Sequence, residues 1–323
     1  MSNEEKLPLV KVLATGGTIA NTPSGRVHLE EVAESIPELK SVARLELEEL
    51  FRVGGSEIVP DRWIIIAKRI NEVLAAEKEV HGIVITHGSN TLEETAYFLH
   101  LVVKSVKPVI LTAAQRPFNT LSSDGPKNFL DAVVVAASDE AVSKGLMTVV
   151  NGEIHSARDV TKRMSYRLQT YTSPDVGALG FVDQRRVTFY RLPIRKHTLA
   201  SEFDVSGTQK LSRVEIIYTA SGTDAMLIDA AVERADAEGL IIAVSPTGAP
   251  APAMKETLWK VARNGIPIVY ANRGGHDRLR IMQPKEPFIA GDNLNPQKAR
   301  VLLMLALIKT KDFVEIQRIF NEY

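Results

Sequence analysis

Short runs of apolar residues alternate with amphipathic stretches from residue 9 onward. The apolar runs are rich in β-branched residues, which is typical of buried strands. In the first half of the chain they are LVKVLA, GIVITH, PVILTA and LMTVV. Because strands and helical patterns alternate, the sequence predicts an α/β fold in which helices cover a mainly parallel sheet.

Two of the amphipathic stretches predict helices directly. Apolar residues recur at helical spacing from Trp63 to Leu74, and Asp61 stands where it can cap that helix. Thr91 is followed three residues later by Glu94, which is the pattern of a capping box. We expect the second helix to begin there and to run through Leu101.

A second series of elements follows residue 213. Helices are predicted from Met226 to Glu233, around Met254 to Arg263, and twice after Pro296. The predicted strands are VEIIYT, LIIAVS and IPIVYA. This series predicts another α/β unit.

The stretch between the two series is polar and lacks periodicity, as a linker does. It runs from Leu192 to Arg213. We therefore expect an N-terminal catalytic domain over residues 1–191, a linker over 192–213 and a C-terminal α/β domain over 214–323.

Composition narrows the function classes. Lys+Arg and Asp+Glu both number 39, so no overall field favours nucleic acid or an anionic membrane surface. No apolar run reaches the ~18 residues of a membrane span. The chain has no cysteine, which excludes a disulfide framework, a thiolate nucleophile and a cysteine metal site. MSNEEKLP lacks the pattern of a secretory signal, so a cytoplasmic protein is expected, or a periplasmic one if a signal had been removed.

Candidate catalytic and binding residues follow the ends of predicted strands, because ligands of open α/β sheets bind beyond the carboxyl ends of the strands. The first such segment is ATGGTIA, where Thr15 directly follows a strand. Gly16 and Gly17 let the backbone approach a ligand closely, and Thr18 adds a second hydroxyl. Taken alone, a pair of glycines between a strand and a helix is more often only a tight turn.

The second segment is ITHGSNTLEE, which places Ser89 and Asn90 at the N-terminus of a predicted helix. Hydroxyl and amide groups there can bind a carboxylate or an oxyanion, or can simply cap the helix. For His87 we favour a hydrogen-bonded structural role, since no acidic partner is evident.

The third and fourth segments are QRPFNTLSSDGPKN and ARDVTK. The fourth ends in Lys162. A lysine held among neutral groups loses its proton more easily and can then deprotonate a hydroxyl. Spacing alone does not separate that role from the role of a solvated surface lysine.

Five segments in a fixed order resemble the bacterial asparaginase/glutaminase family of threonine amidohydrolases. They are TGGTIA, THGSNTLEETAYFL, RPFNTLSSDGPKN, ARDVTK and LNPQKARVLLMLAL, and together they span nearly the whole chain. The resemblance implies a larger N-terminal domain and a smaller C-terminal α/β domain. It also implies a homotetramer built from intimate dimers, a small-molecule amide as substrate, and no metal or organic cofactor.

The same resemblance implies roles for individual residues. Thr15 is matched to the nucleophilic threonine, and Lys162 to the lysine of a second triad in which Ser89 replaces a threonine. Ser56 is matched to a serine that binds the substrate's α-carboxylate. Gly88 and Thr18 are expected to line the substrate site. The nucleophile would attack the amide carbon, Ser89 and backbone N–H groups would stabilise the oxyanion, and water would hydrolyse the acyl-enzyme.

Two departures from the family bear on the substrate. Asn90 stands where family asparaginases carry an aspartate that binds the α-ammonium group, and Glu57 stands where they carry a glutamine. One hypothesis is that the negative charge has moved within the pocket from position 90 to position 57. The alternative is that Glu57 points to solvent. Loss of the carboxylate at position 90 should also lower the pKa of Lys162.

Other departures lie in the lid and in the second domain. The segment NTPSGRVHLEE lacks the family's lid tyrosine, SPTGAPAPAM lacks an asparagine, and Glu286 is an uncertain counterpart of a family glutamate. These changes predict hydrolysis of a small carboxamide without the usual α-ammonium group. A genuine L-asparaginase that relies on Glu57, and a catalytically silent ligand-binding protein, are the alternatives.

Overall fold

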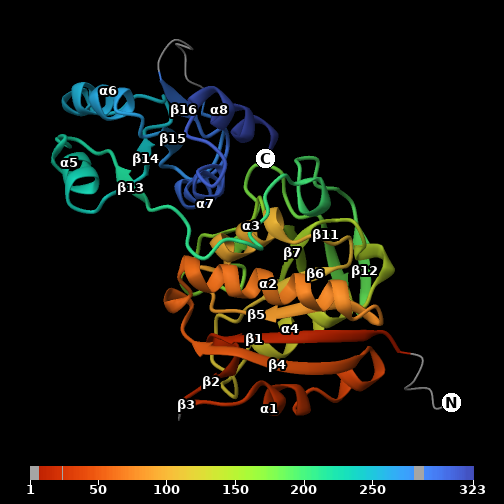
Figure 1. Cartoon of the computed structure of the whole chain (residues 1–323). Helices are drawn as coiled ribbons and strands as arrows, with labels where there is room; N and C mark the ends of the chain where they lie inside the picture. The colour runs from red at the N-terminus through yellow and green to blue at the C-terminus, as the bar shows by residue number, and fades with distance from the viewer. Residues whose placement is uncertain (1–6, 24, 280–286) are drawn as a thin grey trace. The chain divides into compact units, whose positions relative to one another are not determined.

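A computed structural model describes residues 7–23, 25–279 and 287–323. The chain forms two compact units, Met1–Gly207 and Thr208–Tyr323 (Figure 1). Each unit is an α/β structure. Glu286 lies outside the described residues.

An eight-stranded sheet in the order β12-β11-β8-β7-β6-β5-β1-β4 forms the centre of the first unit. Strands β4, β1, β5, β6 and β7 run parallel to one another. The pairs β7–β8, β8–β11 and β11–β12 are antiparallel. The bounds are β1 Leu9–Gly16, β4 Arg44–Val53, β5 Val80–Thr86, β6 Val109–Thr112, β7 Leu146–Val150, β8 Glu153–Ser156, β11 Gly180–Asp183 and β12 Arg186–Phe189. The mainly parallel sheet predicted from the apolar runs is confirmed.

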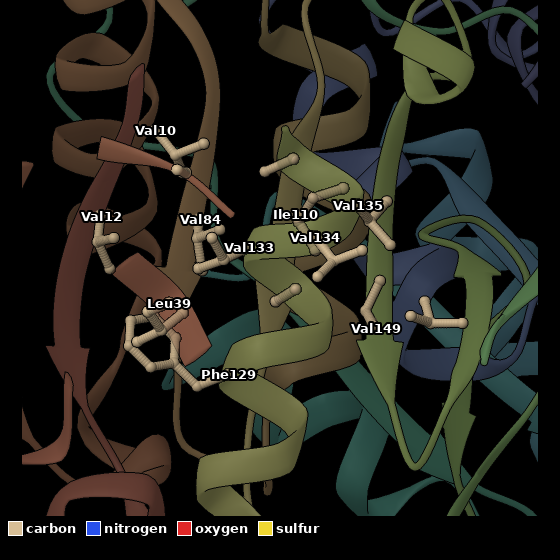
Figure 2. Packing of buried hydrophobic residues seen from close by; sticks show 14 of the residues in the cluster. Val10, Val12, Leu39, Val84, Ile110, Phe129, Val133, Val134, Val135 and Val149 are labelled. Atoms are coloured by element: carbon tan, nitrogen blue, oxygen red, sulfur yellow. The ribbon is translucent and has the colours of Figure 1, made fainter. Parts of the chain in front are cut away.

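The parallel strands β1, β5, β6 and β7 are mostly apolar because both faces of the sheet are covered there. Figure 2 shows the core beneath α4, where Val133 approaches the strand residues Val84 and Ile110. Ile83 and Ile85, which alternate with Val84 and so point to the other face, are also fully buried. The helices of this unit are α1 Leu29–Glu34, α2 Pro60–Ala76, α3 Leu92–Val102 and α4 Gly125–Ala136.

Both predicted helix starts differ in detail from the structure. Val59 is the N-cap of α2 and Pro60 occupies its first turn, so Asp61 lies inside the helix and does not cap it. Thr91 is the N-cap of α3, but its hydroxyl donates to the carbonyl of Gly55 at 2.6 Å, and no capping box forms. A tertiary acceptor has replaced the local one.

The second unit holds a four-stranded parallel sheet in the order β13-β14-β15-β16. Its strands are β13 Val214–Tyr218, β14 Gly239–Val244, β15 Ile268–Asn272 and β16 Phe288–Ala290. Its helices are α5 Met226–Glu233, α6 Lys255–Arg263, α7 Pro296–Ala306 and α8 Phe313–Glu322. The predicted strands and helices of the second series are all present, and β16 is an addition.

Two short hairpins and several single turns complete the described structure. The hairpins pair β2 Asn21–Thr22 with β3 Gly25–Arg26, and β9 Thr161–Lys162 with β10 Tyr171–Thr172. The 3-10 turns are η2 Thr18–Ala20, η3 Pro37–Ser41, η4 Gly55–Glu57, η5 Asp139–Ala141, η6 Thr198–Ala200 and η7 Pro252–Met254. No helix of the described residues combines the length and apolarity that a membrane span requires.

Candidate functional site

Three glycines bring three loops of the first unit into direct contact. A Cβ added to Gly17 would lie 2.6 Å from the backbone nitrogen of Gly88, and one added to Gly88 would lie 2.4 Å from the Cα of Gly55. Real Cβ atoms do not approach backbone atoms so closely, so only glycine fits at these positions. The contact gathers the loops that carry Thr18, Ser56 and Ser89.

Thr15 is the last but one residue of β1 and belongs to the interior of the sheet. Its side chain is 1% exposed, and its hydroxyl donates to the carbonyl of Thr86 on β5 at 2.8 Å. A nucleophile needs a hydroxyl that faces the substrate and a base that accepts its proton. The position of Thr15 does not meet this requirement, and so does not support the nucleophilic role implied by the resemblance.

Thr18 of the same motif, in contrast, lies outside the sheet and is partly exposed. It opens η2 directly after Gly17, whose φ of 90° turns the chain away from the sheet. Thr18 is half-buried, and within the described part of the chain its hydroxyl has no hydrogen-bond partner. Among the two threonines of this motif, Thr18 is the one whose hydroxyl is available.

Lys162 lies within hydrogen-bonding distance of both Ser89 and Asn90 in the structure. Lys162 Nζ lies 2.7 Å from Ser89 Oγ and 3.3 Å from Asn90 Oδ1. Ser89 is buried in the turn before α3, whereas Lys162 reaches it from β9. Burial lowers the pKa of Lys162 below its usual value. No ion pair joins Lys162 to a carboxylate of the described residues.

Ser56 and Glu57 lie on η4, where both are exposed. One carboxylate oxygen of Glu57 accepts the backbone N–H of Gly54 at 2.6 Å and lies 3.8 Å from the guanidinium of Arg26. Arg26 belongs to the β2–β3 hairpin and also donates to the carbonyl of Arg52 at 2.6 Å. The negative charge of Glu57 is therefore partly compensated by the Gly54 N–H and by the Arg26 guanidinium.

His87 is buried directly after β5, and its Nδ1 lies 2.8 Å from the carbonyl oxygen of Gly88. A carbonyl only accepts, so Nδ1 carries the proton of the neutral ring. Burial lowers the pKa of His87 to about 4, against a smaller opposing effect of the Gly88 hydrogen bond. The hydrogen-bonded histidine favoured from the sequence is what the structure shows.

Tyr171 is a site residue that the sequence did not reveal. Its hydroxyl donates to the carbonyl of Ser89 at 2.5 Å, and it stands opposite Lys162 in the β9–β10 hairpin. Burial, together with the charges of Glu93 and Asp124, raises the pKa of Tyr171 well above its usual value. No sequence pattern marks this tyrosine, because the contact depends on a pairing between distant segments.

The third predicted segment is a structured loop around Asp124. This carboxylate accepts the backbone N–H groups of Gln115 and Arg116, at 2.9 Å each for the shorter contacts, and the side-chain amide of Asn128. Gln115 in turn contacts the carbonyl of Ser165, which lies in the connection between β9 and β10. The loop therefore supports the segment that carries Lys162. Within the described residues, no group of His, Asp and Glu is arranged to hold a metal ion.

The chain matches two family models along its length. Residues 9–195 match the model described as Asparaginase, N-terminal, and residues 213–320 match the Glutaminase/Asparaginase C-terminal domain. Among curated proteins it is 40% identical to L-asparaginase 2 of Bacillus subtilis (strain 168), covering 100% of this chain and 88% of that protein. It is 36% identical to the glutaminase-asparaginase of Pseudomonas fluorescens biotype A, covering 100% and 92%.

A solved structure is similar over the same extent. The probable cytoplasmic L-asparaginase from Campylobacter jejuni superposes with a TM-score of 0.94 at 36% sequence identity, covering 98% of this chain and 100% of that one. Two family models, the curated relatives and the solved structure agree on the family. The chain belongs to the asparaginase/glutaminase family of amidohydrolases, which act on C–N bonds other than peptide bonds.

Proposed function

We propose that this enzyme hydrolyses a small-molecule carboxamide or a related C–N bond through a threonine acyl-enzyme and releases ammonia or an amine. The observation that carries the proposal is the contact of 2.7 Å between Lys162 Nζ and Ser89 Oγ beside the Thr18 loop. A partly desolvated lysine next to a hydroxyl can accept a proton that the hydroxyl relays.

The nucleophile of this proposal is Thr18. Its oxygen attacks the amide carbon, its proton passes through Ser89 to the neutral amine of Lys162, and Lys162 returns a proton to the departing nitrogen. Water then attacks the ester carbon, which restores the Thr18 hydroxyl and releases the carboxylic acid. Thr15 keeps its hydroxyl on the Thr86 carbonyl and holds β1 to β5.

The charges around the site favour a substrate that lacks the α-ammonium group. Asn90 provides a neutral amide next to Lys162, and the carboxylate of Glu57 is held by the Gly54 N–H and by Arg26. An ammonium group would therefore find a weaker counter-charge than an aspartate supplies. We expect asparagine and glutamine to be slow or minor substrates.

Genuine L-asparaginase activity is the second candidate, and the names of the relatives favour it. L-asparaginase 2 of Escherichia coli (strain K12) is 37% identical over 98% of this chain. In that candidate Glu57 would supply the counter-charge for the substrate's ammonium group. The two candidates therefore differ in what they require of one carboxylate.

An ammonia-release screen separates the candidates. The panel contains asparagine, glutamine, their D-forms, succinamic acid, lactams and cyclic imides, with a coupled amine assay for products other than ammonia. The leading proposal expects succinamic acid or a cyclic amide to exceed asparagine in kcat/KM. Asparagine exceeding succinamic acid by about tenfold or more would establish the second candidate, since one ion pair is worth about that much. No turnover of any amide would leave a ligand-binding protein.

We also propose a homotetramer built from dimers, working in the cytoplasm without a metal ion or organic cofactor. The support is the family membership and the full-length match to relatives. Light scattering measures the mass of the assembly. Activity that survives dialysis against a chelator is the expected result for the absence of a metal.

A further inference from the structure

Ser89 is held from two neighbouring peptide groups as well as through its hydroxyl. The Tyr171 hydroxyl donates to the carbonyl of Ser89 at 2.5 Å, and His87 Nδ1 donates to the preceding carbonyl, that of Gly88, at 2.8 Å. Both side chains are buried, with exposures of 2% and 0%. Two buried rings thus fix the backbone on either side of the residue that contacts Lys162.

Fixing a carbonyl also fixes an N–H group. A trans peptide is planar, and its C=O and N–H point in opposite directions. The hydrogen bond from His87 to the Gly88 carbonyl therefore sets the direction of the Ser89 N–H, which belongs to the same peptide group. In the same way, the hydrogen bond from Tyr171 to the Ser89 carbonyl sets the direction of the Asn90 N–H. Among the described residues, neither N–H donates to a protein acceptor.

The contacts of Tyr171 with the Ser89 carbonyl and of His87 with the Gly88 carbonyl are called here the backbone clamp. The β9–β10 hairpin connects this clamp to Lys162, the proposed base. Tyr171 and Lys162 are cross-strand partners, so one hairpin brings the amine to the Ser89 hydroxyl and the phenol to the Ser89 carbonyl. Ser173, two residues after Tyr171, lies 3.0 Å from His155 on β8, which ties the hairpin to the large sheet. The phenol stays protonated and remains a donor across the working pH range, because burial opposes its ionisation.

We infer that Tyr171 and His87 are positioning residues that hold the backbone N–H groups of Ser89 and Asn90 toward the oxyanion formed from the substrate carbonyl. The inference rests on the proposed amide hydrolysis. Preorganised backbone donors stabilise the negative charge that develops on the carbonyl oxygen without rearranging during the reaction. A peptide group released from its clamp would have to be reordered in each transition state.

The test removes one hydroxyl and leaves the ring in place. In Tyr171→Phe we expect kcat to fall about tenfold to a hundredfold, with KM within about threefold of the parent, because an aimed oxyanion donor acts mainly in the transition state. Hydrogen–deuterium exchange of a peptide spanning residues 86–91 should become about tenfold faster. His87→Leu should behave in the same way, whereas His87→Asn, whose side-chain amide can occupy the place of Nδ1, should recover most of kcat.

Tyr270→Phe is the matched control, since Tyr270 is a tyrosine of β15 that is 3% exposed in the other unit. The inference requires lower kcat and faster exchange together in Tyr171→Phe, and neither change in Tyr270→Phe. Any other combination overturns it, including a loss of kcat without faster exchange. If the parent turns over no amide, the proposed function fails, and the exchange measurement alone decides whether the clamp exists.

Discussion

Lys162 Nζ and Ser89 Oγ lie 2.7 Å apart although 73 positions separate them in the chain. No carboxylate of the described residues pairs with this amine, and burial lowers its pKa. The neutral form of Lys162 therefore becomes available at a lower pH than for a solvated lysine.

Lys162→Met should lower kcat by about a hundredfold to ten-thousandfold, which is the usual contribution of a positioned general base. In the parent, kcat should rise with pH, because the base form increases as Lys162 loses its proton below the usual lysine range. In Lys162→Met this rise should disappear from the pH profile of kcat. An unchanged profile in the variant would exclude Lys162 as the base.

Asn90→Asp should restore a carboxylate beside Lys162 and move the rising limb of the pH profile to higher pH. The physical reason is that a nearby negative charge favours the protonated amine and raises its pKa. The same change should lower KM for asparagine more than KM for succinamic acid, which has no ammonium group. Equal effects on both substrates would show that position 90 does not contact the ammonium group. Asn90→Ala controls for the loss of the native amide.

Thr18→Ala should reduce turnover by at least about a thousandfold, since it removes the proposed nucleophile. Thr15→Val keeps the shape of its side chain and removes one buried hydrogen bond, so we expect it to lose about 1 kcal/mol of unfolding free energy and to keep kcat within about threefold. Steady-state kinetics with chemical denaturation measures both. The reverse pattern, with Thr15→Val inactive, would restore the role that the sequence resemblance implied.

Glu57→Gln should leave KM for asparagine within about threefold, because an exposed ion pair with Arg26 contributes little binding energy. If Glu57 instead bound the substrate's ammonium group, KM should rise tenfold or more. Arg26→Gln is the matched variant, since it removes the partner of the same pair. Parallel small effects in both variants would identify the pair as a link between the β2–β3 hairpin and η4.

Acid should destabilise the first unit through His87. Its pKa falls from 6.5 to about 4 on folding, so the unfolded chain binds the proton more readily between these values. The stability linked to this group is present above pH 6.5 and is lost as the pH falls to 4, by up to about 3 kcal/mol. Denaturant midpoints measured across this range should fall less steeply in His87→Asn than in the parent.

The pattern of apolar residues in the sequence was enough to predict the strands that are buried in the sheet. The apolar runs predicted β1, β5, β6 and β7, because a strand covered on both faces is mostly apolar. They did not predict β4, the edge strand RLELEELFRV, in which Leu45 and Leu47 pack against the core while Glu46, Glu48 and Glu49 interrupt the apolar pattern. Thr91 shows the limit for helix caps, since the hydroxyl found a tertiary acceptor in Gly55.

For the site, the sequence by itself determined the family and the set of loops, since five ordered motifs carry the same residues that the fold later gathers. It could not show that the sheet engages the Thr15 hydroxyl or that the chain turns at Gly17, so the resemblance matched the nucleophile to Thr15, whereas our proposal is Thr18. Nor could it find Tyr171, whose contact with Ser89 spans 82 positions. Only the tertiary structure decides such pairings, because each depends on the register of strands that are distant in the chain.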